Sequence, residues 1–522
     1  MKDLLHIGAM LTAHARLSPG KIGARDLERA LTFKDWNARA CRLANALLGL
    51  GLAKGDRVAV LAYNCLEWAE IYAATAKAGL MAVPVNFRLT GAEVLYIISN
   101  AEAAAVIVQD ELTGTLEDVR HNLPVADGRF IRFGSTPCPA GYRDYETLLA
   151  LGRDSEPELD VLLRDPWTLM YTSGTTGNPK GAIRSHRGAA NMALVTEIEL
   201  GIHRNDGALL VMPMCHANSL YFFGAFAYCG AATTIYSRKN FDPEECVRTL
   251  AEGGVSFTSL VPTHYIMMLA LPAGIKAKYN VGSVRKLMIS SAPARQDTKR
   301  AIMDMFPNSG LYELYGSTEA GWVTMLHPHE QFEKLGSVGR ECTGSAPIKI
   351  MDEEGREVPD GEPGELYSSN PYTFDGYWKL PEKTKDAFRD GYCTAGDMAR
   401  RDADGYIQLV DRKSNMIISG GENVYPSEIE AVIGAHPFVK DVAVIGLPDA
   451  KWGECVHAVV VTHDGASLSD ADLAGWVKEK LAGYKRPRSF TFIADAEMPR
   501  NATGKILHRQ LKARYAHDTK SK

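Results

Sequence analysis

The sequence has nine cysteines but no Cys-x-x-Cys pair, so it predicts neither a disulfide framework nor a zinc site. Its first residues do not have the pattern of a cleavable signal, because Asp3 and the basic residues after it interrupt any apolar run, so we expect none. We therefore expect a cytoplasmic protein. Lys and Arg (58) do not outnumber Asp and Glu (63), and the net charge of -5 argues against nucleic acid as a partner.

Long apolar runs are equally scarce. The uncharged stretch 218–237 approaches membrane length, but it contains two glycines, Asn218, Ser219 and a threonine pair. These residues favour a buried helix followed by a buried strand, so we predict no transmembrane segment. Hydrophobic residues make up 46% of the chain and charged residues 23%, which is ordinary for a globular protein with a large core.

Short β-branched runs alternate with helical patterns over the first 340 residues or so. These runs occupy 57–64, 81–86, 103–110, 208–213, 231–237 and 256–262, and a helical pattern occupies 67–79. The alternation predicts an α/β fold built from layers. From about residue 340, short strands and polar turns predict a small β-rich subdomain.

A second change of pattern follows Arg412. Ser427 and Glu430 have the spacing of a capping box that starts a helix, and strands and a helix near 469–482 follow. We predict a large N-terminal domain of residues 1–412 and a smaller α+β C-terminal domain of residues 413–522. The C-terminal 39 residues, from Tyr484 onward, contain ten Lys or Arg and three Asp or Glu, so this tail is basic.

The segment 167–181 reads WTLMYTSGTTGNPKG and joins an apolar strand to a loop of glycines and hydroxyls. Glycines let backbone N–H groups approach anionic oxygens, and Lys180 adds positive charge, so the composition indicates a phosphate loop. It is not a Walker A loop, because Gly174 and Gly177 are only three residues apart. Composition alone leaves a Gly-Thr surface turn open.

YTSGTTGNPKG resembles the phosphate-loop signature of the adenylate-forming acyl-CoA synthetase superfamily. Further motifs of this superfamily follow in order, so the resemblance extends from about residue 30 to residue 512. It implies a large N-terminal domain and a mobile C-terminal domain. It also implies that the phosphates of ATP are bound by Thr172, Ser173, Gly174, Thr175, Thr176, Gly177 and Lys180.

YELYGSTEAG, at 312–321, is similar to the YGxTE segment of the superfamily. The resemblance implies that Tyr315 stacks on adenine, that Thr318 contacts the α-phosphate and that Glu319 coordinates Mg²⁺. A carboxylate suits this metal, which commonly bridges protein carboxylates and phosphate oxygens. The resemblance further assigns to the nucleotide site Ser291, Ala292 and Pro293, from SSAPA, together with Glu313.

GYCTAGDMARRDADGYIQLVDR resembles the ribose-binding segment of the superfamily and implies that Asp397 and Arg412 contact the sugar. Two residues later, Ser414 occupies the position of the hinge, a role that depends on backbone rotation. Gly420 and Gly421 match glycines beside the pantetheine tunnel, where the absence of a Cβ lets a thin chain pass.

PRNATGKILHRQL resembles the terminal lysine motif of the superfamily and implies that Lys505 is catalytic. Bringing a carboxylate to ATP places two anions together, and a cation there stabilises the transition state more than the ground state. By weaker resemblance, CoA is bound by Trp452, Tyr484, Arg486 and Arg488, and the acyl pocket is lined by His216, Ala217, Tyr315, Gly316 and Trp322.

These motifs predict an ATP-dependent carboxylate–CoA ligase that uses ATP, Mg²⁺, CoA and a small carboxylic acid. An enzyme that loads a carrier protein is an alternative, although 214–219 has His216 and no Asp for an amino group. A luciferase-type oxygenase is separated only by its substrate, and a noncatalytic nucleotide sensor is a third alternative. The sequence leaves the acid open among aromatic, alicyclic and medium-chain acids, and the oligomeric state as well, a homo-oligomer included.

Overall fold

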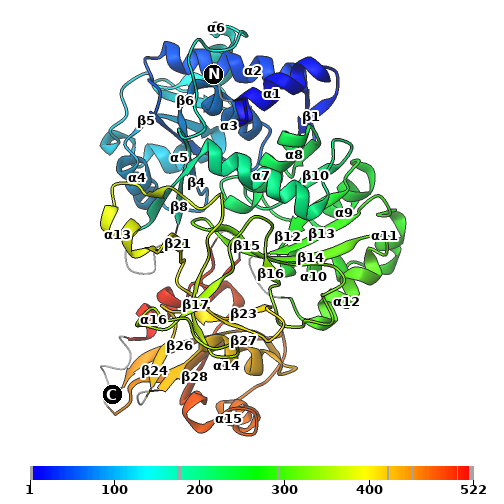
Figure 1. Cartoon of the computed structure of the whole chain (residues 1–522), viewed down its shortest axis with the longest axis vertical. Coiled ribbons are helices and arrows are strands. Elements are labelled where there is room, and N and C mark those ends of the chain that lie inside the picture. The colour runs from blue at the N-terminus through cyan, green and yellow to red at the C-terminus, as the bar shows by residue number, and fades with distance from the viewer. Residues whose placement is uncertain are drawn as a thin grey trace. The chain divides into compact units, whose positions relative to one another are not determined.

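The computed structural model describes residues 4–172, 178–290, 294–419, 422–449, 451–501 and 504–516. The chain forms two compact units (Figure 1). Unit 1 contains Met1–Pro347 and Ser368–Cys393, and unit 2 contains Ile348–Tyr367 and Thr394–Lys522. The predicted domain boundary at 412/413 does not coincide with the bounds of these compact units, and it stays a prediction.

Two large sheets form unit 1. In order across the first sheet, the strands are β16 (Arg340–Glu341), β15 (Gly321–Leu326), β14 (Gly310–Ser317), β13 (Lys286–Ser290), β12 (Phe257–Leu260), β10 (Gly207–Leu210), β11 (Ala232–Ile235), β1 (Ile22–Arg25) and β2 (Ala30–Thr32). In order across the second they are β19 (Gly376–Tyr377), β9 (Lys180–Ser185), β8 (Pro166–Thr172), β4 (Met81–Val85), β3 (Arg57–Leu61), β5 (Ala103–Gln109), β6 (Phe130–Phe133) and β7 (Arg143–Asp144). A small hairpin consists of β20 (Phe388–Arg389) and β21 (Tyr392–Cys393).

The helices of unit 1 pack on these sheets (Figure 1). They are α1 (Ile7–Leu17), α2 (Phe33–Gly49), α3 (Glu67–Ala78), α4 (Gly91–Asn100), α5 (Thr113–Glu117), α6 (Tyr145–Leu151), α7 (His186–Leu200), α8 (Ala217–Cys229), α9 (Pro243–Glu252), α10 (Pro262–Leu269), α11 (Ala273–Lys278), α12 (Gln296–Met305) and α13 (Pro381–Asp386). Two 3₁₀ turns are η1 (Asp110–Leu112) and η2 (Arg120–Asn122). Each predicted β-branched run overlaps a strand, and the predicted α/β fold class is confirmed.

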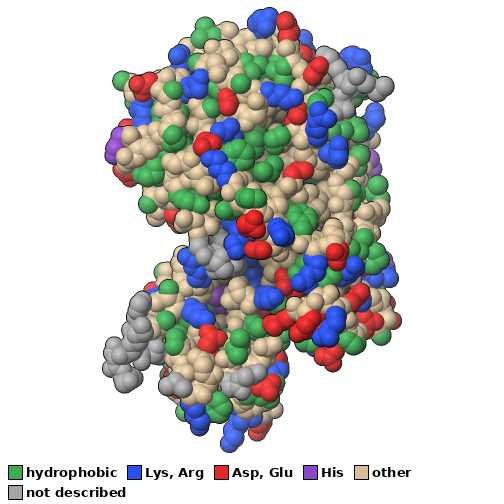
Figure 2. Space-filling model, turned by 60° about the vertical axis from the view of Figure 1, so that its left-hand side comes forward, with side chains coloured by type: hydrophobic (Ala, Val, Ile, Leu, Met, Phe, Trp, Pro, Cys, Tyr) green, Lys and Arg blue, Asp and Glu red, His purple; other side chains and the backbone are tan. Residues whose placement is uncertain are grey.

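Helix α8 followed by β11 occupies the uncharged stretch 218–237, as predicted. Twelve of the thirteen residues of α8 are buried, which explains why this helix is apolar on all sides. None of the helices that the structure describes combines the length and apolar character needed to cross a bilayer. On the face shown in Figure 2, acidic and basic side chains are interspersed over the described part of the chain.

Unit 2 contains two smaller sheets. The four-stranded sheet has the order β17 (Lys349–Met351), β18 (Gly364–Tyr367), β22 (Asp397–Arg401) and β23 (Ile407–Arg412). The five-stranded sheet contains β25 (Glu422–Val424), β24 (Ile417–Ser419), β27 (Gly453–Thr462) and β26 (Val439–Asp449), and β28 (Ser489–Phe492) pairs with β27. The helical segments are α14 (Pro426–Gly434), α15 (Asp470–Lys478), α16 (His508–Ala516), η3 (Gly483–Lys485) and η4 (Asp495–Glu497).

The helix predicted from the Ser427 and Glu430 spacing exists as α14, but the predicted capping box is wrong. The helix begins at Pro426, and its N-cap residue Tyr425 makes no side-chain cap. The Ser427 hydroxyl instead donates to the carbonyl of Val410, and the Glu430 carboxylate accepts from the Val444 N–H at 2.8 Å. Partners distant in sequence therefore replace the local cap that the spacing predicted.

A buried ion pair joins α12 to β14. The Lys299 ammonium lies 2.5 Å from the Glu313 carboxylate, and both side chains are almost completely buried. Burial raises the pKa of Glu313, and Lys299 opposes this shift. A buried carboxylate that loses its cation is strongly destabilising, so this pair helps to hold the strand that leads into the YGSTE segment.

We predict that Lys299→Ala lowers the free energy of unfolding by about 3 kcal/mol, because Glu313 is left buried and unpaired. Burial raises the pKa of Glu313 in the folded state, and the variant lacks the lysine that opposes this shift. The loss of folding free energy therefore grows as pH rises from the ordinary carboxyl range and Glu313 ionises. Thermal melts at acidic and alkaline pH measure both effects. Lys299→Met combined with Glu313→Gln removes both charges and is expected to recover most of the stability. An unchanged melt of Lys299→Ala would contradict this interpretation.

Candidate active site

The phosphate-loop segment connects two antiparallel strands. Thr172 at the end of β8 lies opposite Lys180 at the start of β9. The predicted phosphate ligands Ser173, Gly174, Thr175, Thr176 and Gly177 lie outside the described residues. Of the seven predicted phosphate ligands, Thr172 and Lys180 lie within the described residues.

Lys180 packs against an aromatic ring. Its ammonium lies 4.0 Å from the centre of the Tyr377 ring, and Tyr377 belongs to β19, which pairs with β9. Burial lowers the pKa of Lys180, and the Glu319 carboxylate opposes this shift. The half-buried cation is thus oriented by a ring face and by a nearby carboxylate.

Glu319 lies in the turn between β14 and β15, and only 8% of its surface is exposed. Its Oε1 accepts a hydrogen bond from the Tyr377 hydroxyl at 2.7 Å and another from the Thr172 hydroxyl at 3.3 Å. The structure therefore brings together Thr172, Lys180 and Glu319, three residues that the sequence assigned to the ATP site from separate motifs. Tyr377, which contacts both charged groups, was not predicted.

Arg184 was also not predicted, and it holds the turn that carries Glu319. This β9 residue is 2% exposed, and its Nη1 donates to the carbonyls of Thr318 and Glu319 at 3.0 and 3.2 Å. Its guanidinium lies 5.1 Å from the centre of the Tyr221 ring, and the Tyr221 hydroxyl donates to the same Thr318 carbonyl at 3.4 Å. The Arg184 side chain therefore holds the turn by its backbone carbonyls.

The remaining residues of the YGSTE segment lie on a bulged strand pair. The register between β14 and β15 shifts between Tyr315 and Gly316. A Cβ atom on Gly316 would lie 2.3 Å from the carbonyl oxygen of Gly321, so glycine is required for this close approach. Tyr315 is half-buried. The bulge therefore sets the direction in which the chain enters the turn at Thr318.

The predicted acyl-pocket residues Trp322, His216 and Ala217 lie on two neighbouring elements, β15 and the start of α8. Trp322 is 4% exposed, and its indole N–H donates to the Thr196 hydroxyl at 2.8 Å. Its ring lies 5.2 Å from the ring of Tyr221, edge to face. His216 is the N-cap residue of α8, and burial lowers its pKa, so the neutral imidazole is favoured at neutral pH.

In unit 2, the predicted ribose residues Asp397 and Arg412 are paired. They lie opposite each other on β22 and β23, and their carboxylate and guanidinium are 3.0 Å apart. Ser414 lies in the exposed turn that follows β23. The structure thus places the predicted hinge directly after the predicted ribose-binding strand.

Lys505 lies in the electrostatic field of this pair. Loss of surrounding water and the Arg412 guanidinium lower the pKa of Lys505, whereas Asp397, Asp411 and Glu430 raise it. Lys505 is exposed, and the charges of the predicted ribose residues shift its pKa in opposite directions.

Among the described residues predicted to bind CoA, Arg488 and Trp452 contact each other. The Arg488 guanidinium lies 4.6 Å from the centre of the Trp452 ring. Arg486 instead donates to the Leu481 carbonyl at 2.8 Å, and Tyr484 is 43% exposed. Besides the five phosphate-loop residues named above, the predicted residues outside the described part of the chain are Ser291, Ala292, Pro293, Gly420 and Gly421.

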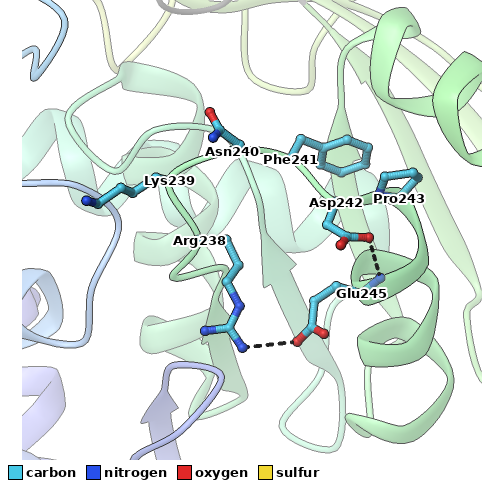
Figure 3. A pocket seen from close by; sticks show the side chains of 7 residues that line it. All are labelled: Arg238, Lys239, Asn240, Phe241, Asp242, Pro243 and Glu245. Carbon is cyan, nitrogen blue, oxygen red and sulfur yellow. Dashed lines mark hydrogen bonds and ion pairs between the residues drawn. The ribbon is translucent and has the colours of Figure 1, made fainter.

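A surface hollow of about 520 Å³ lies between β11 and α9 and is drawn in Figure 3. In it, Arg238 and Glu245 form an ion pair at 3.5 Å, and the Asp242 carboxylate accepts from the Glu245 N–H at 3.0 Å. The hollow contains none of the predicted site residues; its lining is Arg238, Lys239, Asn240, Phe241, Asp242, Pro243 and Glu245. It is therefore separate from the candidate active site.

The residues gathered here are typical of an enzyme that binds a nucleotide. One cluster combines a hydroxyl, a cation and a carboxylate, which together can bind a metal-bound polyphosphate. The other combines a carboxylate that can accept from two ribose hydroxyls with a lysine nearby. Comparison with known proteins agrees with this class.

The family model for AMP-binding enzymes matches residues 11–378, and the model for the C-terminal domain of these enzymes matches residues 428–505. The chain is 35% identical over 510 residues to a feruloyl-CoA synthase of an Amycolatopsis species, covering 98% of this chain and 99% of that protein. It is 34% identical over 517 residues to the long-chain-fatty-acid–CoA ligase FadD13 of Mycobacterium tuberculosis, with 98% and 99% coverage.

Among solved structures, ATP-bound MatB from Rhodopseudomonas palustris matches with a TM-score of 0.88 and 30% identity, covering 99% of each chain. The chain belongs to the AMP-binding enzyme family. The prediction of an adenylate-forming, AMP-producing CoA ligase is confirmed at the level of the reaction class. The roles assigned to single residues stay predictions.

We predict that Arg184→Met slows ATP-dependent pyrophosphate release about 100-fold, because the turn that carries Thr318 and Glu319 loses two hydrogen bonds to its backbone. Arg187→Met is the matched control, since Arg187 is an exposed arginine at the start of α7. Steady-state kinetics and melting curves of both variants make the test. A folded Arg184→Met enzyme with the rate of the control would show that the turn needs no such support.

Proposed function

We propose that this CoA ligase joins a carboxylic acid to CoA in two steps in one active site. In the first, a carboxylate oxygen attacks the α-phosphorus of ATP, and pyrophosphate leaves. In the second, the CoA sulfur attacks the acyl carbon, its proton is released and AMP leaves. The observation that carries the proposal is the 3.0 Å ion pair of Asp397 and Arg412 in unit 2, whose two charges shift the pKa of Lys505 in opposite directions.

Lys505 has a physical task in the first step. The attacking carboxylate and the triphosphate are both anions, and negative charge accumulates around the α-phosphorus. An ammonium placed there stabilises the transition state more than the separate reactants. Asp397 would accept from the ribose hydroxyls, and this would keep the sugar and the α-phosphate in place relative to Lys505. The proposal requires that Lys505 reach the α-phosphate when ATP is bound.

Mg²⁺ would accompany ATP rather than reside in the protein. Among the residues that the structure describes, no group of three or more His, Cys, Asp or Glu side chains forms a metal site. A single buried carboxylate with a neighbouring hydroxyl, as at Glu319 and Thr172, fits a magnesium ion that takes its other ligands from phosphates and water. The bound ion would neutralise phosphate charge, while Tyr377 fixes the orientation of the carboxylate.

For the acid, we favour an aromatic carboxylate. Three aromatic side chains converge near the turn at Thr318: the Trp322 ring lies 5.2 Å from both Tyr221 and Phe222. Flat rings offer an aryl group favourable packing. The feruloyl-CoA synthase relative supports this choice, whereas the FadD13 relative supports a long-chain fatty acid as the second candidate.

Transfer to a carrier protein and noncatalytic nucleotide sensing receive less support. The segment 214–219 has no Asp that could bind a substrate amino group. A sensor would not need Lys180, Glu319, Asp397 and Lys505 together. Turnover that depends on CoA separates a ligase from a carrier-loading enzyme, and pyrophosphate release separates both from a sensor.

We predict that Lys505→Ala slows acyl-adenylate formation by about 1,000-fold. It should leave transfer of a supplied acyl-adenylate to CoA within about threefold, because the second step does not use the ammonium. Since the pKa of Lys505 is lowered, wild-type adenylate formation should also decline with rising pH before the ordinary lysine value of 10.5 is reached. Separate assays of the two half-reactions provide the measurement.

The matched control is Lys478→Ala, which removes an exposed lysine from α15 in the same unit. It should leave both half-reactions unchanged. Undiminished acyl-adenylate formation by the Lys505→Ala enzyme would refute the proposed role.

A panel of carboxylic acids tests the substrate class. We expect kcat/KM for aryl acids such as ferulate to exceed that for long-chain fatty acids by at least about tenfold, which is a moderate difference for an apolar pocket. Trp322→Leu should reduce the aryl preference. The reverse order in the wild-type enzyme would establish the fatty-acid alternative instead.

A further inference from the structure

Three elements of unit 2 meet at one carboxylate oxygen. His508 is the first residue of α16, and its Nε2 lies 2.6 Å from Oε1 of Glu430 on α14. The same Oε1 accepts the backbone N–H of Val444 on β26 at 2.8 Å. Glu430 therefore attaches the start of α16 to both a helix and a strand of the C-terminal sheet.

The start of α16 is adjacent to the turn that carries Lys505. The Asn501 N–H donates to the Lys505 carbonyl at 2.8 Å, and the Lys505 N–H donates back to the Asn501 side chain at 2.9 Å. Arg500 and Ile506 close the base of the turn as a β-bridge. Because Lys505 is tied to Asn501 and lies only three residues before His508, fixing His508 also restrains the backbone at Lys505.

Glu430 also acts on Lys505 through its charge. It is one of three carboxylates that raise the pKa of the lysine, and each of the three has another partner. Asp397 pairs with Arg412 at 3.0 Å, and Asp411 accepts the backbone N–H of Ser427 at 2.9 Å. His508 is the cationic partner of Glu430. Without it, Glu430 would be a competing anion for the Lys505 ammonium.

The charges around His508 favour its protonated form. Burial alone would lower the pKa of His508, but the hydrogen bond and charge of Glu430 outweigh burial, and the pKa is raised. Asp411 on β23 raises it further, and Lys505 opposes both. The imidazolium therefore persists above the pH at which an isolated histidine loses its proton.

We propose that His508 is a positioning residue for acyl-adenylate formation: by pairing with Glu430, it fixes the turn that carries Lys505 and keeps that carboxylate from capturing the lysine ammonium. The inference rests on the proposed role of Lys505 in the first step. It concerns a histidine to which the sequence analysis assigned no function.

The two half-reactions test the proposal. His508→Gln should slow acyl-adenylate formation, measured as single-turnover pyrophosphate release from the full-length enzyme, by about tenfold. Transfer of a supplied acyl-adenylate to CoA should stay within about twofold, because Lys505 does not take part in it. Arg514→Gln is the matched control, because Arg514 lies on the same helix as His508 and its 3.1 Å ion pair joins it to Glu497 of η4. It should leave both steps unchanged.

A double variant separates positioning from general damage. Glu430→Gln introduced into His508→Gln removes the competing carboxylate and should restore acyl-adenylate formation to within about threefold of the wild-type rate. If His508 only stabilised the fold, the second substitution would restore nothing, and the first would impair both half-reactions. Either of these results overturns the proposal.

The pH dependence gives an independent readout. The His508–Glu430 pair is intact below the raised pKa of His508 and is lost as pH rises through it. The ratio of the wild-type to the His508→Gln rate should therefore be largest near about pH 6 and fall toward one at alkaline pH, whereas the titration of Lys505 itself is common to both enzymes. A ratio that does not change with pH would contradict the proposal.

Failure of this inference is distinguishable from failure of the proposed function. If Lys505→Ala abolishes acyl-adenylate formation and His508→Gln leaves it intact, only the role of His508 is wrong. If Lys505→Ala leaves this half-reaction intact, the role of Lys505 fails, and the positioning role of His508 fails with it.

Discussion

The interaction on which the site of unit 1 depends is the contact between the buried Arg184 guanidinium and the turn at Thr318 and Glu319. Arg184 belongs to the eight-stranded sheet, and the turn joins two strands of the nine-stranded sheet. One side chain therefore links two sheets at the place where their predicted site residues meet. Thr172 and Tyr377, both on the eight-stranded sheet, donate hydrogen bonds to the Glu319 carboxylate.

In unit 2, the corresponding constraint is the balance of charge around Lys505. Lys505, which we propose to act on the α-phosphate, has a pKa that the charges of Asp397, Asp411 and Glu430 raise. Arg412 and His508 supply positive charge to two of these carboxylates. Both units thus use buried or half-buried charged groups in pairs, and this limits the cost of removing them from water.

Sequence patterns predicted much of the fold because buried parallel strands are continuous apolar runs. All five residues of β4 are buried, and this run could be recognised without a structure. Arg184 could not be found in this way, because a charged residue on a strand is ordinarily assigned to the surface. Its role appears only when β9 packs beside a turn from another sheet.

The capping box at Ser427 and Glu430 failed for a similar reason. A short-range pattern predicts a short-range bond, but both side chains found partners elsewhere, in Val410, Val444 and His508. Motif resemblance assigned Thr172, Lys180 and Glu319 to one site, and the structure places them close together. It carried no information on Tyr377, whose position depends on the pairing of β19 with β9.

The central chemical claim is that a carboxylate oxygen becomes bonded to the α-phosphorus of ATP before CoA takes part. An acid labelled with ¹⁸O in its carboxyl group tests this directly. Complete turnover with CoA should transfer one labelled oxygen from each acid molecule to AMP, detected by mass spectrometry or by ³¹P NMR. Label in inorganic phosphate or pyrophosphate, or AMP without label, would contradict the acyl-adenylate mechanism.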